Sequence, residues 1–243
     1  MSPKTKGGEA CKMNPHVLAI IPAYNEQDSI ASTMDSLKRH APWVDCLIVD
    51  DGSTDATVAV CQEHGFNYVS HATNLGLAGA FQTGMKYAHR KGYDYAIQFD
   101  ADGQHDAQSI QVMLDAAVSN NANIVIGSRF VTVEKPKSAR MAGSALLQAI
   151  IRLTTGQKVV DPTSGMRMYD AEMIEFFANA FDFGPEPDTI ALLMRRGAKL
   201  VEVQVTMHER TAGKSYLTMS KSIMYMLSES FSILFAQWFR GNK

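Results

Sequence analysis

The sequence of 243 residues has few cysteines, no surplus of basic side chains and no long uninterrupted apolar segment. Its three cysteines, Cys11, Cys46 and Cys61, are odd in number and show no C-x-x-C spacing. This pattern argues against a disulfide framework and against a zinc site. We therefore expect a chain that functions in a reducing, cytoplasmic environment.

The charge balance excludes one class of partner. Lys and Arg together number 23 and Asp and Glu number 25, so the formal net charge is -2. Proteins that coat nucleic acid present a basic surface, and this composition has no basic surplus. We expect no nucleic-acid partner, and any binding of phosphate must depend on a few local side chains.

Long apolar segments and a secretion signal are also missing. No segment reaches the roughly 18 to 20 apolar residues of a membrane-spanning helix. Residues 1–15 are polar and rich in Gly and Lys, so we expect a disordered start rather than a signal peptide. The closest apolar segment, 223–239, is interrupted by Ser228, Glu229 and Ser230.

The tail at 216–243 leaves two interpretations open. Its apolar residues fall on nearly every helical face, which is unusual for a solvated helix. The helix either packs on its own domain, or it lies in a membrane interface or binds a small membrane partner protein. Flanking Lys and Arg residues favour contact with anionic lipid headgroups.

Strand-like and helix-like segments alternate along the first half of the chain. Short apolar runs that end in polar or glycine residues lie at 17–26, 46–55, 67–71, 95–103 and 123–130. Helical patterns lie between them at 27–40, 54–64, 78–91 and 107–119. This alternation predicts an α/β fold with a mostly parallel, doubly wound sheet and helices on both faces.

After residue 130 the alternation weakens. The pattern predicts a loop at 131–139, helices at 141–155, 170–180 and 187–196, and a strand at 200–207. No repeat and no long linker divides the chain, so we expect one domain at 16–215.

Several polar residues stand where a predicted strand stops, and these are Asn25, Glu26, Asp50, Asp51, Asp100 and Asp102. Parallel sheets bind ligands at the carboxyl ends of their strands, so these side chains predict a single site.

The stretch AIQFDADGQHDA at 96–107 places Asp100, Asp102 and Asp106 within seven residues, which requires a cation nearby. In an extended segment the side chains at i and i+2 point to the same side. Asp100 and Asp102 could therefore hold Mg²⁺ or Mn²⁺, with Gln104 as a third oxygen ligand. In the structural alternative, Asp100 caps the next helix and Asp102 is exposed in a turn.

The stretch IVDDGSTDAT carries a second pair of carboxylates directly after an apolar run. Asp50 and Asp51 could accept a hydrogen bond from a nucleobase, for example from the imide of uracil or the amino group of guanine. The same residues are also common in turns, with Ser53 or Thr54 as a helix cap.

Seven segments in this order resemble the family-2 glycosyltransferases, most of all the branch that contains dolichyl-phosphate mannose synthase and its bacterial relatives. They are IPAYNE, VDDGSTD, NLGLAGAFQTG, FDADGQH, GSRF, DPTSGMRMY and HERTAGKS, and they cover roughly residues 16 to 215. The resemblance implies a GT-A fold and an inverting transfer of a sugar from a UDP- or GDP-linked donor to a lipid-linked acceptor, at the cytoplasmic face of the membrane.

The resemblance also assigns roles to residues. The base and ribose of the nucleotide-sugar would be held by Pro22, Ala23, Tyr24, Glu26 and Asp51. The donor diphosphate and its Mg²⁺ or Mn²⁺ would be held by Asp100, Ala101, Asp102 and Gln104. The basic motif that closes over the donor phosphates would comprise Arg210, Lys214 and Ser215, with Asp102 and Arg210 as catalytic residues. The acceptor phosphate would be bound by Arg129, Arg140 and Ser144.

The reaction chemistry alone does not decide which acceptor is used or which residue acts as a general base. A divalent cation stabilises a departing diphosphate as a Lewis acid. A lipid phosphate is already ionised, whereas a sugar hydroxyl needs a general base. Asp161 is the first candidate for a base or orienting group, and Glu186 or Asp188 is the second.

Two departures from the family bear on the rival functions. Hydroxyl-directed members carry an adjacent Glu-Asp pair and a Q-x-x-R-W motif, whereas this chain has Glu186-Pro187-Asp188 and no such motif. This disfavours transfer to a sugar hydroxyl in capsule or cell-wall polysaccharide synthesis. The chain also lacks the paired C-terminal membrane helices of many bacterial members. A non-enzymatic scaffold that binds nucleotide-sugar is the remaining alternative.

Overall fold

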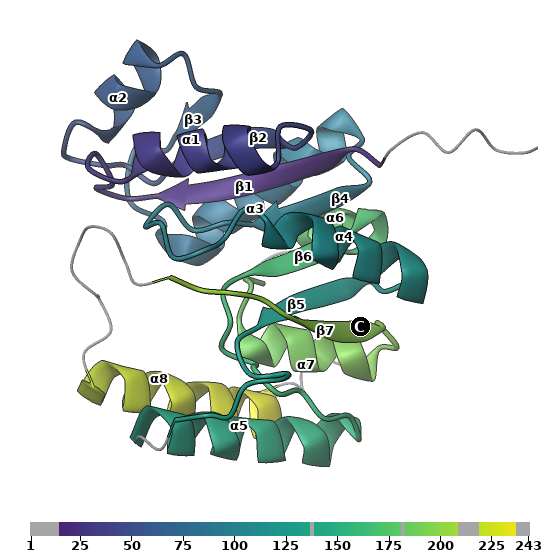
Figure 1. The fold of residues 1–243 in the computed structure, drawn as a ribbon. Helices are drawn as coiled ribbons and strands as arrows, with labels where there is room; N and C mark the ends of the chain where they lie inside the picture. Colours follow the sequence, from purple (N-terminus) through teal and green to yellow (C-terminus); the bar gives the residue numbers. More distant parts are fainter. Residues whose placement is uncertain (1–14, 137–138, 181–182, 209–218, 237–243) are drawn as a thin grey trace, which may run out of the picture.

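The computed structural model describes residues 15–136, 139–180, 183–208 and 219–236. Within these ranges one sheet has seven strands, in the order β3-β2-β1-β4-β6-β5-β7. The strands are β1 (Val17–Ala23), β2 (Asp45–Asp50), β3 (Tyr68–Ser70), β4 (Tyr95–Gln98), β5 (Ile124–Ser128), β6 (Arg167–Asp170) and β7 (Leu200–Gln204). The sheet and the helices around it are shown in Figure 1.

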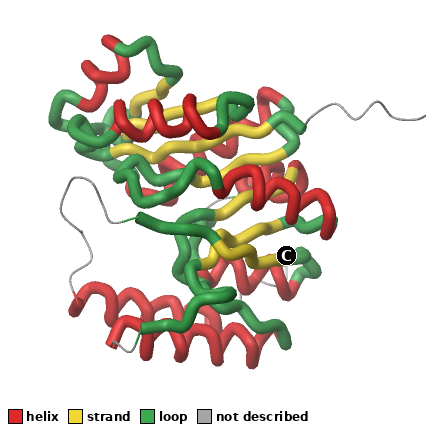
Figure 2. The backbone as a smooth tube through the Cα atoms, viewed as in Figure 1, coloured by secondary structure: helices red, strands yellow, loops and turns green. Residues whose placement is uncertain are grey.

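The helices follow the strands closely along the chain. They are α1 (Ile30–His40), α2 (Thr57–Glu63), α3 (Gly76–Lys91), α4 (Ser109–Asn120), α5 (Ala139–Thr155), α6 (Ala171–Asn179), α7 (Pro187–Arg195) and α8 (Met219–Phe231), which continues as the π-helical turn η1 (Ser232–Ala236). The predicted alternation of strands and helices is confirmed, and Figure 2 shows the strands as one layer surrounded by helices.

One strand was not expected from the sequence. β6 runs antiparallel to both of its neighbours, β4 and β5, whereas the other pairings in the described sheet are parallel. It is four residues long, begins with the charged Arg167 and ends with Asp170, so its sequence lacks the apolar run of the other central strands. The mostly parallel sheet is confirmed, with β6 as the exception.

The sheet buries both of its faces. In β1, Leu18 and Ile20 belong to a core that α3, α5, α6 and α7 cover, while Ala19 and Ile21 belong to a core on the side of α1 and α4. All four side chains are fully buried. A parallel sheet covered on both faces needs apolar residues at every position, which explains the continuous apolar run in β1.

The C-terminal helix lies against the rest of the domain. α5 and α8 run side by side, at the bottom of Figure 1, and a Cβ at Gly143 of α5 would lie 2.4 Å from the Sδ of Met226 in α8. Glycine therefore allows a close approach of the two helices. Among the helices in the described ranges, none is both long enough and apolar enough to span a bilayer.

Candidate active site

The carboxyl ends of three adjacent strands form the base of the site. β1 lies between β2 and β4, with Ala23 opposite Asp50 and Ile20 opposite Gln98. The N–H of Asp51 donates to the carbonyl of Ala23 at 2.8 Å, so the β1–β2 contact continues beyond the last strand residue. The predicted nucleotide residues after β1 and β2 therefore lie next to the acidic segment that follows β4.

The segment after β4 is held in shape by its own histidine. The N–H of Asp100 donates to Nδ1 of His105 at 2.9 Å, and Nε2 of the same ring lies 3.5 Å from Oδ2 of Asp100. The N–H of Gln104 donates to Oδ1 of Asp102 at 3.0 Å. His105 is 5% exposed, so it is an internal support of this loop and not a surface histidine.

The structural alternative for these carboxylates is wrong. The N-cap of α4 is Gln108, so Asp100 does not cap the helix, and Asp102 is buried at 5% exposure. It is Asp106 that accepts the N–H of Gln108, at 3.0 Å. Asp102 is therefore a buried carboxylate beside Asp100 and not an exposed turn residue.

The donor set fits a hard divalent cation. Asp100 and Asp102 supply carboxylate oxygens and Gln104 an amide oxygen, the ligand type of Mg²⁺ and Mn²⁺. Across the described residues, no group of three or more His, Cys, Asp or Glu side chains is arranged to hold a metal by itself. Such a site suits Mg²⁺, which is usually bound by one or two carboxylates together with substrate phosphates.

The chain that follows β7 reaches this loop. The N–H of His208 donates to the carbonyl of Gln104 at 2.9 Å, and Met207 forms an isolated antiparallel bridge with His105. Nε2 of His208 also lies 3.9 Å from Oδ2 of Asp106. The predicted residues Arg210, Lys214 and Ser215 lie outside the described residues, as does the side chain of Arg140.

Asp51 is part of a buried polar cluster. Its carboxylate accepts the N–H groups of Leu75 and Gly76 at 2.8 and 2.7 Å and contacts Nδ1 of His71 at 2.8 Å. Nε2 of His71 contacts Oγ1 of Thr83 at 2.9 Å. These contacts fix the carboxylate and also hold the start of α3, a structural role that the sequence pattern did not indicate.

The other predicted base and ribose residues lie at the end of β1 and in the loop that follows it. Pro22, Tyr24 and Glu26 are partly buried, and Ala23 is buried. Oε2 of Glu26 accepts the hydroxyl of Ser29 at 2.5 Å, and the N–H of Glu26 donates to Oγ1 of Thr57. The loop after β1 is thus fastened to the start of α2, beyond the Asp50-Asp51 pair.

Arg129 and Asp161 were assigned separate roles, and the structure pairs them. Nε and Nη2 of Arg129 each donate to one carboxylate oxygen of Asp161 at 2.7 Å. Burial alone would raise the pKa of Asp161, but the hydrogen bonds and positive charge of Arg129 outweigh it and lower this pKa. The carboxylate is therefore a poor proton acceptor and is suited to orienting Arg129.

Glu202 of β7 holds the backbone beneath this pair. Its two carboxylate oxygens accept the N–H groups of Val160 and Asp161 at 2.6 and 2.8 Å. Lys135 and Gln148 donate to the carbonyl of Val160 at 2.5 and 2.8 Å, which fastens α5 to the same segment.

Ser144 on α5 is buried at 2% exposure. Its hydroxyl accepts a hydrogen bond from Gln148 at 3.3 Å. Among the described residues, no hydrogen bond joins Ser144 to Arg129. The structure therefore gives Ser144 a packing position behind the Val160 segment.

The loop at 161–166 connects the Arg129–Asp161 pair with the segment after β4 that carries Asp100 and Asp102. Thr163 contacts Nη2 of Arg129 at 3.2 Å. The hydroxyl of Ser164 donates to the carbonyl of Gly127 in β5. A Cβ at Gly165 would lie 3.0 Å from Oδ2 of Asp100. The motif DPTSG therefore runs from Asp161, which pairs with Arg129, to Gly165, which lies beside the predicted metal ligand Asp100.

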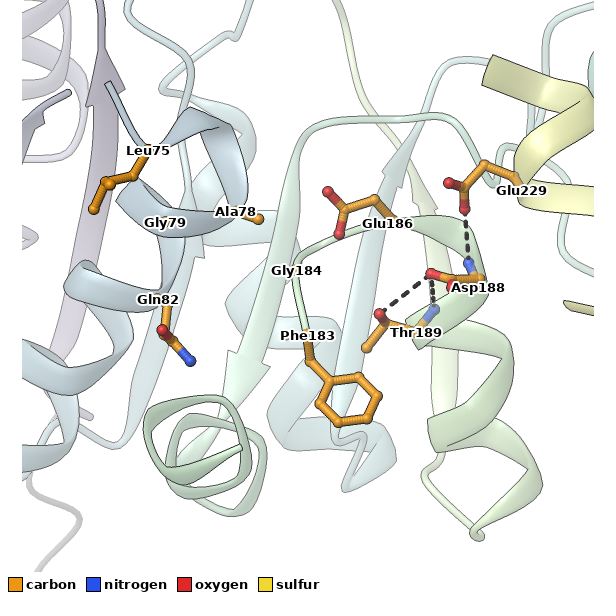
Figure 3. Close-up of a pocket in the computed structure, with 10 residues that line it drawn as sticks. All are labelled: Leu75, Ala78, Gly79, Gln82, Phe183, Gly184, Glu186, Asp188, Thr189 and Glu229. Atoms are coloured by element: carbon orange, nitrogen blue, oxygen red, sulfur yellow. Dashed lines mark hydrogen bonds between the residues drawn. The ribbon is translucent and has the colours of Figure 1, made fainter. Parts of the chain in front are cut away.

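A cavity of about 660 Å³ lies between α3, the segment 183–189 and α8, and Figure 3 shows its lining. Glu186 and Asp188, the second candidates for a base, line it together with Glu229. Oε2 of Glu229 accepts the N–H of Asp188 at 3.2 Å. Burial, followed by the charge of Asp188, raises the pKa of Glu229 to about 7.

Several residues that make contacts in this region were not among the site residues predicted from the sequence. Gln98, Arg167 and Glu202 are polar residues within or at the ends of short strands, and Lys135 lies in a segment predicted only as a loop. The signal for Glu202 was a charged side chain in an otherwise apolar strand, which requires a partner or a ligand.

Comparison with known proteins identifies the family. Residues 18–177 match the family described as glycosyl transferase family 2. The chain belongs to glycosyl transferase family 2. The family and enzyme class expected from the seven motifs are therefore confirmed: the chain is a glycosyltransferase.

Two relatives of this family-2 chain are similar over most of their length. The undecaprenyl-phosphate mannosyltransferase of Micrococcus luteus is 32% identical over 218 residues, which are 83% of this chain and 87% of that protein. The polyprenol monophosphomannose synthase of Mycolicibacterium smegmatis is 33% identical over 227 residues, which are 87% of this chain and 85% of that protein.

The structural comparison supports the same fold. The mannosyltransferase PcManGT from Pyrobaculum calidifontis, solved in complex with GDP-Man and Mn²⁺, gives a TM-score of 0.65 at 18% identity. The likeness covers 96% of this chain and 66% of that chain. It concerns the fold alone, and the GT-A fold expected from the sequence is confirmed.

Proposed function

We propose that this family-2 enzyme is a metal-dependent, inverting glycosyltransferase that moves a sugar from a nucleotide-diphosphate donor to a polyprenyl phosphate. The position of Asp100 and Asp102 at the end of β4 carries the proposal, because the loop 161–166 joins them to the Arg129–Asp161 pair. The two relatives described above act, by their names, on undecaprenyl phosphate and make polyprenol monophosphomannose.

The donor site has support from three strand ends. Pro22, Ala23, Tyr24, Glu26 and Asp51 would hold the base and ribose. Oδ2 of Asp51 accepts the N–H of Gly76, and a carboxylate oxygen can accept a second hydrogen bond. The contact between His208 and Gln104 brings the chain after β7 to the predicted metal ligands. Arg210, two residues later in the sequence, is proposed to contact the donor diphosphate.

Asp100 and Asp102, with Gln104, would hold Mg²⁺ or Mn²⁺. When bound, the cation supplies Lewis-acid stabilisation of the charge that develops on the departing diphosphate. The chain's own basic residues add to this stabilisation, and Arg210 and Lys214 are proposed for that task. His105 keeps Asp100 in place by accepting its backbone N–H.

The acceptor is proposed from the state of Asp161. An oxygen of the acceptor phosphate attacks the anomeric carbon, and the bond from that carbon to the donor diphosphate breaks on the opposite face. No proton has to be removed, because the phosphate is already ionised. A sugar hydroxyl would need a base, and Asp161, with its lowered pKa, is a weak one. Asp161 is therefore proposed as a positioning residue for Arg129.

We also propose peripheral contact with a membrane through α5 and α8. The exposed side of α8 and η1 carries Met224, Leu227, Phe231 and Phe235, and Leu146 and Leu153 are exposed on the adjacent α5. On α8 the spacing of three and four residues forms one apolar stripe. A stripe of this kind suits the headgroup region of a membrane that carries the acceptor lipid. A small membrane partner protein at the same surface is the other possible occupant.

The direct test is product formation. The protein is incubated with undecaprenyl phosphate, UDP- or GDP-linked hexoses and Mg²⁺, and the lipid products are analysed by mass spectrometry. We expect a polyprenyl-phosphate hexose whose anomeric configuration, by NMR, is opposite to that of the donor. Transfer to an oligosaccharide hydroxyl without any transfer to undecaprenyl phosphate would contradict the proposal. No turnover and no nucleotide-sugar hydrolysis with any donor would favour the scaffold alternative.

A further inference from the structure

His71 and Thr83 connect Asp51, the candidate nucleobase residue, to helix α3. Nδ1 of His71 lies 2.8 Å from Oδ1 of Asp51, and its Nε2 lies 2.9 Å from Oγ1 of Thr83. The side chains of His71 and Asp51 are 11% and 5% exposed, so the contact between them is largely shielded from water. Neither His71 nor Thr83 was among the site residues expected from the sequence.

The backbone around His71 is fixed independently of its ring. His71 directly follows the edge strand β3, and its N–H donates to the carbonyl of Asp50 at 2.9 Å. A Cβ at Gly52, where φ is +73°, would lie 2.8 Å from the carbonyl carbon of Thr73. The loop after β3 therefore packs directly against the loop after β2, and this packing keeps the imidazole beside Asp51.

The position of the ring hydrogen follows from the partners of His71. A carboxylate only accepts hydrogen bonds, so Nδ1 must carry the hydrogen that Asp51 accepts. A hydroxyl both donates and accepts, so Thr83 satisfies Nε2 whether or not that nitrogen carries a hydrogen. The N–H groups of Leu75 and Gly76, at the start of α3, also donate to Asp51. Three N–H donors from two elements thus fix the orientation of this carboxylate.

These donors use the two oxygens of Asp51 unequally. Oδ1 accepts from His71 and from Leu75, and two hydrogen bonds fill the lone pairs of a carboxylate oxygen. Oδ2 accepts the N–H of Gly76 and has room for one more donor. A ligand that binds Asp51 must therefore present a hydrogen-bond donor to Oδ2, in a direction that the contact with His71 sets.

The nucleobases differ in what they present to such an acceptor. Uracil carries an N–H at N3 and guanine carries one at N1. The corresponding ring nitrogens of cytosine and adenine have a lone pair and no hydrogen. A fixed carboxylate oxygen accepts from the first two bases and repels the ring nitrogen of the other two, whereas a carboxylate that can turn away loses this distinction.

We propose that His71, held in turn by Thr83, is a positioning residue that fixes Asp51 and so makes the donor site select uracil or guanine over cytosine and adenine. The inference rests on the proposed function, in which Asp51 holds the base of the donor. His71 and Thr83 act on specificity through the orientation of Asp51 and not through contact with the nucleotide.

The test compares nucleotides that differ only in the base. Isothermal titration calorimetry with Mg²⁺ measures Kd for UDP, CDP, GDP, ADP and pyrophosphate in the wild-type protein and its variants. We expect UDP to bind at least tenfold more tightly than CDP, or GDP at least tenfold more tightly than ADP. The ratio of the two Kd values is the readout, because a purely structural role would weaken both nucleotides alike.

Two substitutions remove the proposed contacts and one keeps them. His71→Phe removes both ring nitrogens, Thr83→Val removes the hydroxyl at nearly constant shape, and Thr83→Ser retains it. The Kd ratio should fall at least fivefold in His71→Phe and at least threefold in Thr83→Val, the effect of losing one hydrogen bond. In Thr83→Ser it should stay within a factor of two of the wild-type ratio.

Two controls isolate the effect on the base. The Kd of pyrophosphate, which has no base, should change less than twofold in every variant. Thr155→Val, on α5, removes another hydroxyl that donates to a carbonyl and should leave all the Kd values unchanged.

The outcomes separate this inference from the proposed function. A wild-type protein that binds none of the nucleotides would contradict both. A wild type that binds nucleotides without preference, or variants that keep the wild-type ratio, would contradict only the role of His71 and Thr83. An equal loss of UDP, CDP and pyrophosphate would assign the two residues to the fold and would also overturn it. Should His71→Phe melt early, Thr83→Val and Thr83→Ser decide by the same ratio.

Discussion

Arg129 and Asp161, which are 32 residues apart in the sequence, form a two-point ion pair with both N–O distances at 2.7 Å. Asp161 is fully buried, whereas the Arg129 side chain keeps 23% of its surface exposed. The pair therefore anchors one side of the guanidinium and leaves the rest available to an anion. This division of roles is the basis for proposing that Arg129 binds the acceptor phosphate.

Replacing Asp161 tests the positioning role. In Asp161→Asn, Arg129 loses its counter-charge, and we expect the KM for undecaprenyl phosphate to rise about tenfold, the cost of a weakened charged hydrogen bond. The KM for the nucleotide-sugar should stay within a factor of two. Steady-state kinetics with each substrate varied in turn measures both. A large fall in kcat with an unchanged acceptor KM would instead indicate a general base.

The same variant has a predicted effect on stability. Because the folded-state pKa of Asp161 lies below its ordinary value of 3.8, the stabilisation is present above that value and is lost as the pH falls through the folded pKa. Removing one partner of a buried pair costs about 3 kcal/mol. Urea unfolding at pH 7 and pH 3 should show a smaller pH dependence in Asp161→Asn than in the wild type. Asp35→Asn, at an exposed position, is the matched control.

Removal of the metal should abolish transfer. We expect EDTA to stop turnover, Mg²⁺ or Mn²⁺ to restore it, and Asp102→Asn to lower kcat by about 100-fold or more, since a Lewis acid is worth several kcal/mol. Binding of Mn²⁺ in the presence of nucleotide, followed by electron paramagnetic resonance, should weaken in the same variant. Full activity in EDTA would contradict the assignment.

Alanine substitutions at two glycines should cause different defects, one in metal binding and one in stability. In Gly165→Ala the added Cβ meets the carboxylate of Asp100, whose side chain is 34% exposed and can move, so we expect weaker Mn²⁺ binding with little change in melting temperature. In Gly84→Ala the Cβ would lie 2.3 Å from Cγ2 of the buried Ile20, so we expect a loss of about 1–3 kcal/mol of stability. Similar melting temperatures for the two variants would contradict this distinction.

Glu229 predicts a pH dependence of stability at neutral pH. Its pKa is raised from 4.5 to about 7, so the folded state binds this proton more tightly than the unfolded state. The stabilising contribution is complete below about pH 4.5 and is lost as the pH rises through 7. Glu229→Gln should therefore be more stable than the wild type at pH 8 by about 1 kcal/mol, after allowance for solvent screening. Urea unfolding at pH 5 and pH 8 measures the difference, and Glu63→Gln on the surface of α2 should show none.

The apolar stripe predicts binding to lipid vesicles. Phe231 and Phe235 are 65% and 55% exposed, with ring centroids 4.9 Å apart. Changing both to Ser should reduce co-sedimentation with anionic vesicles at least tenfold, because each buried aromatic side chain is worth about 1.5–3 kcal/mol. Val118→Ser removes an equally exposed apolar side chain from α4 and should have no effect. Unchanged sedimentation of the double variant would contradict the membrane proposal.

Most of the fold was predictable because its signals are local. The apolar run of β1 and the helical pattern of α3 each follow from the period of nearby residues, and their bounds differ from the expected ranges by only a few positions. β6 was not predictable in this way. Its four residues pair with β4 and β5, which lie far away in the sequence, and the buried Arg167 conceals the strand pattern.

The sequence by itself determined the family, the strand-helix alternation and the position of the acidic motif after β4, because motif order and hydrophobic period are properties of the chain. Only the tertiary structure decided which polar groups meet. It paired Asp161 with Arg129 and brought Gln98 beside Arg167 across two strands of opposite direction. The physical reason is that the cost of burying a charge is met by partners distant in sequence, and only the packed sheet determines which ones they are.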